Sequence, residues 1–254
     1  MLSEERRKRV LQIIKENGSA AVTDLSSLMN VSTMTIRRDI AHLASQGLVV
    51  KTHGGAVWPA GSTASEPRYE AKAEVNVREK QRIGVAAAEM VRDGETVLLD
   101  SGSTTYQIAR SLRGKRGLTV VTNDLVIASD LSKSASVSLL LVGGSVRPGI
   151  FSTVGPYAEE MLRQLSVDKA FLAADAVNLE KGILNSNPEE VPVKRLMVRA
   201  GRETILVVDH SKFDKLGLSF VCDIEDVDMI ITDSGVHPEI AAELRERGLA
   251  VKVC

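Results

Sequence analysis

Residues 31–40 read VSTMTIRRDI, and the helix that they predict decides how the first part of the chain folds. Ser32 is a typical helix N-cap. One face of the predicted helix is apolar and is expected to be buried, at Ile36, Ile40 and Leu43. At about 100° per residue, the opposite face carries Met34, Arg38, Ala41 and Ser45. A face of mostly small side chains suits insertion into the DNA major groove, which is about 12 Å wide.

Charged and hydrogen-bonding groups cluster near the start of this helix. Arg37 and Arg38 are adjacent and can reach a phosphate and a guanine edge. The free N–H groups of the helix start, at Ser32 and Thr33, favour a second phosphate contact. We therefore expect this helix to be the DNA-reading element.

The flanking residues complete a helix-turn-helix plan. Apolar positions at 10–14 predict a first helix that Gly18 ends, and a second stripe from near Thr23 predicts another helix that stops at the tight break 30–31. Leu48–Val50 predict a strand, and Gly54-Gly55 predict the turn of a hairpin or wing. Residues 1–57 are thus predicted to form an all-α winged helix-turn-helix domain.

The charge distribution separates this domain from the rest of the chain. The 254 residues hold 32 Lys+Arg and 33 Asp+Glu, a net charge of −1. Residues 1–57 alone hold 8 basic and 5 acidic residues, whereas the remainder has a net charge of −4. A basic head on an acidic body predicts two domains with different partners, and nucleic acid suits the head.

The remainder reads as a linker followed by an α/β domain. Residues 58–75 contain Pro59, Gly61 and Pro67 without periodicity, which predicts a linker. From residue 76 to 254, short apolar runs alternate with helical stretches, a pattern typical of a mostly parallel sheet covered on both faces. The runs are 96–100, 118–122, 137–142, 169–173, 204–209, 229–232 and 249–253.

Residues 98–107, LLDSGSTTYQ, predict an anion site. A strand ends at Asp100, Gly102 allows close backbone approach, and a helix follows. Hydroxyl groups gather in the same loop, at Ser101, Ser103, Thr104 and Thr105. Together they suit a phosphate. The alternative is an ordinary turn in which Thr104 and Gln107 form a capping box.

Polar and glycine residues follow several other predicted strands, where an open parallel sheet binds its ligands. The candidates are Thr122, Asn123, Gly143, Gly144, Asp175 and Lys212. Each is also typical of a turn or a cap. On a later helix, Lys194 and Arg195 could form a solvated face or bind the anion of a ligand. Capping is a sufficient explanation for the residues at 187–190.

Residues 31–40, followed by KTHGGA at 51–56, resemble the winged helix-turn-helix signature of the DeoR family of bacterial transcriptional regulators. The resemblance implies that Thr35, Arg37 and Arg38 contact DNA and that His53, Gly54 and Gly55 lie in the wing. His53 could equally be a structural residue of the wing. The complete set of DNA-binding candidates is Ser32, Thr33, Met34, Thr35, Arg37, Arg38, His53 and Gly54.

The rest of the chain is similar to the effector domain of that family, in segments 99–105, 118–123, 142–144, 209–213 and 231–233. The resemblance implies a fold like that of sugar-phosphate isomerases and a phosphorylated sugar as effector. Loop 101–105 would hold the phosphate, and the sugar end would be lined by Thr122, Asn123, Asp175 and Lys212. Around the strand-end aspartate the family often has glycines, whereas this chain has AADA at 173–176. The methyl groups of these alanines leave less room for a ligand to approach the backbone.

These observations predict a cytoplasmic repressor of a sugar-utilisation operon. It would bind double-stranded operator DNA as a homodimer or homotetramer, without a cofactor or a catalytic residue. The four histidines are scattered and no Cys/His spacing suits a metal. Two cysteines favour a reducing compartment, no apolar run reaches the roughly 18 residues of a membrane span, and the charged start is unlike a signal peptide.

Two other interpretations remain open at this stage. One is an isomerase of phosphorylated sugars with an attached regulatory head, in which Asp100, Asp175 and Lys212 act as acid–base groups. The other is a head that mediates only oligomerisation, with Arg37 paired to Asp24 or Asp39.

Overall fold

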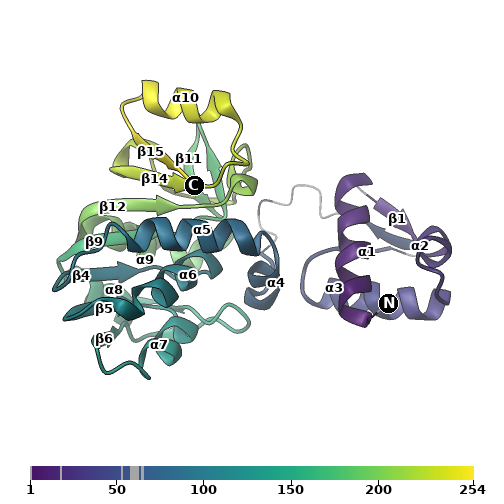
Figure 1. The fold of residues 1–254 in the computed structure, drawn as a ribbon, viewed down its shortest axis with the longest axis horizontal. Helices are drawn as coiled ribbons and strands as arrows, with labels where there is room; N and C mark the ends of the chain where they lie inside the picture. Colours follow the sequence, from purple (N-terminus) through teal and green to yellow (C-terminus); the bar gives the residue numbers. More distant parts are fainter. Residues whose placement is uncertain (1, 18, 53, 58–62, 64–65) are drawn as a thin grey trace. The chain divides into compact units, whose positions relative to one another are not determined.

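The computed structural model describes residues 2–17, 19–52, 54–57, 63 and 66–254 (Figure 1). The chain divides into two compact units, Met1–Ala71 and Lys72–Cys254. The last part of the predicted linker is not irregular, because α4 (Tyr69–Glu74) lies within it and buries Tyr69 and Ala71. No helix among the described residues has the length and apolarity needed to cross a membrane.

The first unit is a winged helix-turn-helix. Its helices are α1 (Ser3–Asn17), α2 (Val22–Met29) and α3 (Thr33–Ser45). Its strands are β1 (Ser19–Ala21), β2 (Val50–Lys51) and β3 (Gly55–Val57), which form an antiparallel sheet in the order β1-β3-β2. β1 was not predicted, because its three residues show no alternating pattern. The strand expected at 48–50 begins only at Val50, because residues 46–49 form the turn and bend that leave α3, where the Leu48 N–H donates to the Leu43 carbonyl. His53 lies outside the described residues.

The ends and the buried face of α3 are as predicted. The Ser32 hydroxyl accepts a hydrogen bond from the Thr35 N–H at 3.2 Å, so Ser32 is the N-cap. Asn30 ends α2 in the left-handed region at φ 52°. Ile36, Ile40 and Leu43 are buried in the core of the unit.

The second unit is built on a seven-stranded parallel sheet in the order β15-β14-β12-β9-β4-β5-β6. Its strands match the seven predicted runs: β4 (Thr96–Leu99), β5 (Leu118–Thr122), β6 (Val137–Leu141), β9 (Val167–Leu172), β12 (Gly201–Val207), β14 (Met229–Thr232) and β15 (Ala250–Val253). The sheet is all-parallel because helical crossovers connect its strands.

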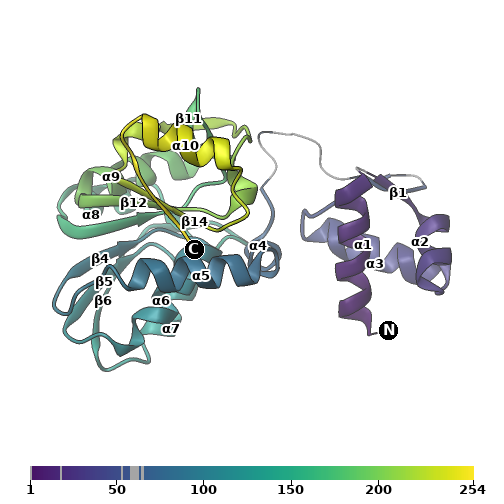
Figure 2. The same cartoon turned by 45° about the horizontal axis from the view of Figure 1, so that its top comes forward.

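Helices cover both faces of this sheet (Figure 2). They are α5 (Val77–Ala88), α6 (Ser103–Ser111), α7 (Leu125–Leu131), α8 (Pro156–Arg163), α9 (Val191–Ala200) and α10 (Pro238–Glu246). Alternate residues of a strand face different cores: Leu98 packs with residues of α8, α9 and α10, whereas Val97 packs with residues of α5, α6 and α7. Gly84 lets α5 approach α6, since a Cβ there would lie 2.6 Å from the Gln107 Cβ.

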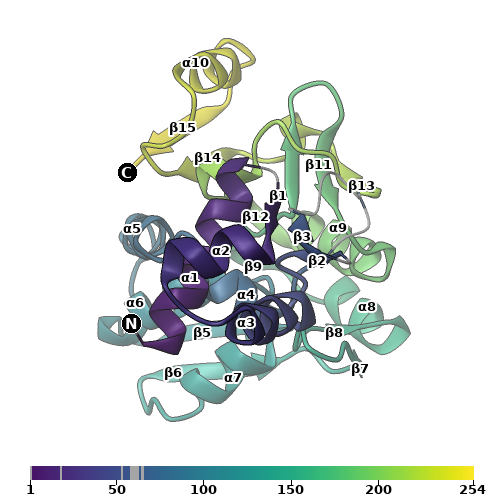
Figure 3. The same cartoon turned by 90° about the vertical axis from the view of Figure 1, so that its right-hand side faces the viewer.

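Shorter elements lie in the connections between the strands of the parallel sheet. An antiparallel sheet pairs β10 (Ala176–Asn178), β11 (Gly182–Asn185) and β13 (Ser219–Cys222), and Figure 3 shows β11 and β13 side by side. A hairpin pairs β7 (Ser145–Val146) with β8 (Thr153–Val154). The 3-10 turns are η1 (Leu112–Gly114), η2 (Pro188–Glu190), η3 (His210–Lys212) and η4 (Ile224–Asp226).

The strand order has a switch point between β4 and β9. From β4 the chain adds β5 and β6 on one side, and it then returns to add β9, β12, β14 and β15 on the other. Loops that leave β4 and β9 therefore diverge, and this is where open α/β sheets bind ligands.

Candidate functional site

The outer face of α3 presents the predicted DNA-binding side chains to solvent. Arg37 and Arg38 are exposed, and Met34 is 58% exposed. Ser32, Thr33 and Gly54 are also exposed, whereas Thr35 is half-buried. Within the described part of the chain neither arginine forms an ion pair, so both guanidinium groups are available to a ligand.

Asp39 has a different partner from the one considered in the sequence. Its carboxylate accepts a hydrogen bond from Arg6 Nε at 2.6 Å and lies 3.7 Å from Arg7 Nε. The carboxylate thus ties α3 to α1. The pairing of Arg37 with Asp39, which the alternative of an oligomerisation head would have used, is not formed, and Arg6 of α1 supplies the cation instead.

In the second unit, a carboxylate follows each of five strands, and all but Asp175, which is half-buried, are buried. Asp100 follows β4, Asp124 follows β5 by two residues, and the others follow β9, β12 and β14 as Asp175, Asp209 and Asp233. Because parallel strands end at one edge, the five carboxylates share that edge of the sheet. Most are occupied by the protein's own donors, as described next.

Asp100 is held by a buried lysine. Its Oδ2 accepts from Lys194 Nζ at 2.5 Å and from the Ala173 N–H at 2.9 Å, while its Oδ1 accepts from the Ser101 N–H at 2.8 Å. Burial disfavours the ammonium, but Asp100 and Glu190 outweigh that effect and raise the pKa of Lys194. Lys194 is 3% exposed, so the solvated face considered for it is wrong.

Asp124 shapes the loop that leads into α6. Its Oδ2 accepts from the Ser101 hydroxyl at 2.9 Å and from the Gly102 N–H at 3.1 Å, and its Oδ1 caps α7. Burial raises the pKa of Asp124. Two of the predicted anion donors of the loop, Ser101 and Gly102, are therefore already used.

The N-terminus of α6 keeps its donors uncommitted. Gly102 is the N-cap, so the capping box of Thr104 and Gln107, the alternative to an anion site, is not formed. The Thr105 hydroxyl donates to the Gly102 carbonyl at 2.8 Å. Among the described contacts, none uses the N–H groups of 103–105 or the hydroxyl of Thr104. Three helix N–H groups and a hydroxyl are therefore available as donors, a set that suits an anion.

Asp175 lies among lysines. Its Oδ1 is 2.9 Å from Lys72 Nζ, and its Oδ2 accepts from the Ser186 N–H at 3.0 Å. Burial would raise the pKa of Asp175, but the ammonium groups of Lys72 and Lys212 outweigh it and hold that pKa far below its ordinary value. Within the described residues, no hydrogen bond or ion pair engages the Lys212 ammonium, which makes it available to a ligand.

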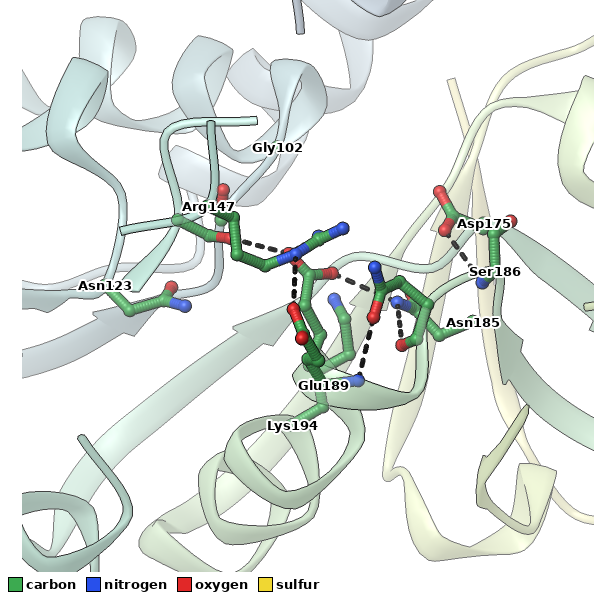
Figure 4. A network of polar contacts seen from close by, with 12 residues as sticks. Gly102, Asn123, Arg147, Asp175, Asn185, Ser186, Glu189 and Lys194 are labelled. Carbon is green, nitrogen blue, oxygen red and sulfur yellow. Dashed lines mark hydrogen bonds and ion pairs between the residues drawn. The ribbon is translucent and has the colours of Figure 1, made fainter. Parts of the chain in front are cut away.

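A second network, of which Figure 4 labels Arg147 and Asn185, surrounds the buried side chain of Glu190. Its Oε1 accepts from Arg147 Nη1 at 2.7 Å and from the Ser152 hydroxyl at 2.6 Å, and its Oε2 accepts from Asn185 Nδ2 at 3.0 Å. Burial opposes ionisation, yet Lys194 and Arg147 hold the pKa of Glu190 below its ordinary value. The capping role expected for residues 187–190 holds for Asn187, whose side chain accepts a hydrogen bond from the Glu189 N–H. It does not account for Glu190, whose side chain is the centre of this network.

The end of β5 carries one unsatisfied acceptor. Asn123 is 2% exposed; its Nδ2 donates to the Thr153 carbonyl, and its Oδ1 has no partner among the residues that the structure describes. A buried unpaired acceptor is costly, so a ligand hydroxyl is a suitable donor here. Thr122 is fully buried and its hydroxyl donates to the Leu99 carbonyl at 2.8 Å, so it supports the turn instead of offering a free group.

The glycine pair after β6 lies at the hairpin. Gly143 and Gly144 are exposed, and Gly144 has φ 154°. A Cβ at Gly144 would lie 2.6 Å from the Val154 carbonyl oxygen, so the close approach of β7 and β8 requires glycine there. A cavity of about 660 Å³ beside this hairpin is lined by Arg147, Asn187 and Glu189, among others.

Sequence reasoning missed Lys72, Arg147 and Asn185 as parts of this site. Lys72 lies in the segment predicted as linker, Arg147 follows the two-residue strand β7, and Asn185 ends the short strand β11, so none of them lies in a periodic pattern. Only their proximity to strand ends in the fold reveals them. No group of three or more His, Cys, Asp and Glu side chains suited to a metal was found in the described part of the chain.

Two family models match the chain: a DeoR-like helix-turn-helix domain over residues 6–60 and a DeoR C-terminal sensor domain over residues 75–234. The chain belongs to the DeoR family of transcriptional regulators. It is a DNA-binding regulator whose first unit holds the helix-turn-helix and whose second unit holds the sensor domain.

Relatives of this DeoR-family protein match over almost its whole length. It is 38% identical to a putative aga operon transcriptional repressor of Escherichia coli O157:H7, over 97% of this chain and 92% of the relative. It is 36% identical to the transcriptional repressor AccR of Agrobacterium fabrum, over 92% of this chain and 91% of the relative. Among solved structures, ribose 5-phosphate isomerase A from Methanocaldococcus jannaschii matches with a TM-score of 0.40 and 18% identity, over 54% of this chain and 55% of the isomerase.

Proposed function

We propose that this DeoR-family protein represses a sugar-utilisation operon and that a phosphorylated sugar, bound at the strand-end site, controls it. The repressor role is supported by relatives named as repressors. The protein would act in the cytoplasm on double-stranded operator DNA, as a homodimer or homotetramer.

One observation carries the choice of effector: the uncommitted N-terminus of α6 at the switch point of the sheet. The N–H groups of residues 103–105 and the hydroxyl of Thr104 suit a phosphate, and the Lys212 ammonium adds an available positive charge. Asn123 Oδ1, buried without a donor, suits a sugar hydroxyl. In this proposal the phosphate lies at α6 and the sugar extends toward β5.

The carboxylates of this site are poorly suited to acid–base chemistry, which supports a sensor without catalytic activity. Asp100 accepts three hydrogen bonds, one of them from the buried Lys194 ammonium. Asp175 is paired with Lys72, and the ammonium groups of Lys72 and Lys212 hold the pKa of Asp175 far below its ordinary value, which makes it a weak general base. Turnover of phosphorylated sugars by the purified protein, abolished by Lys212→Met, would contradict this part of the proposal.

A thermal-shift screen with matched sugars and sugar phosphates tests the effector class. A ligand at about 100 times its Kd stabilises the native state by about 2.7 kcal/mol, so a bound sugar phosphate must raise the unfolding midpoint. Thr104→Val and Lys212→Met should reduce the shift, whereas Lys181→Met, at an exposed lysine, should not. A shift by unphosphorylated sugars alone would overturn the phosphate role of α6.

A further inference from the structure

The chain enters the sensor unit through α4. The ammonium group and the backbone carbonyl of Lys72 attach this helix to other segments of the sensor unit. The division between the units falls after Ala71, inside α4. Lys72 Nζ lies 2.9 Å from Asp175 Oδ1. The Lys72 carbonyl accepts hydrogen bonds from the Ser103 hydroxyl at 3.3 Å and from Lys80 Nζ. The first residue of the sensor unit is thus fixed by side chains of three other segments.

Two of these partners belong to the proposed effector site. Ser103 is the first residue of α6, whose free N–H groups form the proposed phosphate site. Asp175 follows β9 on the other side of the switch point. The side chains of Lys72 and Asp175 are 18% and 13% exposed, so their ion pair is not sealed from a ligand. Lys80, the third partner, is not part of the proposed effector site. Its side chain is buried, at 4% exposed, and it also donates to the Val75 carbonyl at 2.7 Å.

We propose that the Lys72–Asp175 pair is the regulatory contact of the ligand-free sensor, and that the phosphate of the effector breaks it. A phosphate oxygen at α6 is a stronger acceptor than the Lys72 carbonyl, so it takes the Ser103 hydroxyl. The same phosphate carries more negative charge than a carboxylate and draws the Lys72 ammonium away from Asp175. This inference rests on the proposed phosphate site.

The consequence is a change in α4, the helix through which the chain reaches the DNA-binding unit. Loss of the Ser103 and Asp175 contacts leaves Lys72 with fewer partners on the sensor, while Lys80 continues to hold the end of α4. A ligand shifts a conformational equilibrium only by interacting differently with the two states. Here the difference lies in which group, Asp175 or the phosphate, binds the Lys72 ammonium.

Hydrogen–deuterium exchange of the full-length protein tests the inference, with inorganic phosphate and glucose 6-phosphate as probes. In the absence of a probe, Lys72→Met and Asp175→Asn should accelerate amide exchange in α4 about tenfold, as the loss of one charge-assisted hydrogen bond implies. In the wild type, a probe should slow exchange at 103–105 and accelerate it in α4. In Lys72→Met it should cause no further acceleration in α4.

Controls separate this inference from the proposed function. Lys181→Met should behave as the wild type, and Lys72→Arg should restore the wild-type response. Exchange in α10 should be unchanged in all variants if they fold. Protection at 103–105 without any change in α4 overturns the inference and leaves the phosphate site standing. No protection at 103–105 with either probe overturns the phosphate site, and the inference with it.

Discussion

At the residue scale, Arg38 is the side chain on which DNA reading most depends. It is exposed on the outer face of α3, in the second turn after the capped N-terminus. If it contacts a base edge, Arg38→Ala should cost about 1–3 kcal/mol of specific operator binding and relax specificity at one position. Fluorescence anisotropy with specific and scrambled duplexes measures both effects.

A matched variant controls for charge. Arg9 is also exposed in the first unit, on α1, and Arg9→Ala removes the same charge. It should weaken binding to specific and scrambled duplexes alike, because a phosphate contact carries no sequence information. Undiminished specificity in Arg38→Ala would assign base reading to another residue.

Asp39 is the residue whose loss should most damage the first unit. Asp39 and Arg6 have side chains only 7% and 11% exposed and are joined at 2.6 Å. Removing one partner of a buried pair costs about 3–5 kcal/mol, whereas an exposed pair is worth about 0–1 kcal/mol. Asp39→Asn should therefore accelerate amide exchange throughout α1 and α3. Glu4→Gln, which removes the exposed partner of Lys8, should leave exchange nearly unchanged.

At the element scale, Lys80 on α5 gives the turn between α4 and α5 a pH dependence. Burial is the main cause that lowers the pKa of Lys80 from 10.5 to about 8. Below about pH 8 this lysine is protonated in both the folded and the unfolded chain. Between about pH 8 and 10.5 only the unfolded chain keeps the proton, so the contribution of Lys80 to the free energy of unfolding rises with pH.

Urea unfolding of the wild type and Lys80→Met at several pH values measures this contribution. From pH 7.5 to 9.5, the wild type should gain about 2 kcal/mol relative to the variant, at about 1.4 kcal/mol per pKa unit. The transition followed must be that of the second unit. If the free energy of unfolding of the wild type, relative to that of the variant, stays level or falls as the pH rises, Lys80 keeps its proton in the folded state.

The elements that could be predicted from the sequence are those with a strong repeating pattern. All seven strands of the parallel sheet were predicted, because strands covered on both faces read as continuous apolar runs. β1, β7, β8, β10, β11 and β13 were not, because two to four residues carry no period. α4 was also missed, because its six residues are too few to show a helical repeat.

The candidate site was predictable at the strand ends but not in its pairings. The sequence named Asp100 and Asp175, since polar residues after apolar runs mark that edge, and it offered Lys194, on a later helix, as one of two alternatives for binding the anion. It did not predict that Lys194 binds Asp100 or that Lys72 binds Asp175, because these partners lie 94 and 103 residues apart. Such pairings depend on strand order, which a local pattern does not determine.

At the scale of the whole molecule, the sensor and the DNA-binding unit must be coupled in both directions. If a sugar phosphate changes the affinity for operator DNA by some factor, the operator changes the affinity for that sugar phosphate by the same factor. The Lys72–Asp175 pair is the proposed point of coupling, so Lys72→Met should bring both factors close to one.

The most direct test of the account is the operator affinity of the full-length protein, measured by anisotropy with each sugar and its phosphorylated counterpart. The operator is first selected from genomic DNA. The account predicts that one or more phosphorylated sugars change the Kd for the operator by about 5–150-fold, while the unphosphorylated counterparts leave it unchanged. An equal change with the unphosphorylated sugar would contradict the central claim that the N-terminus of α6 recognises a phosphate.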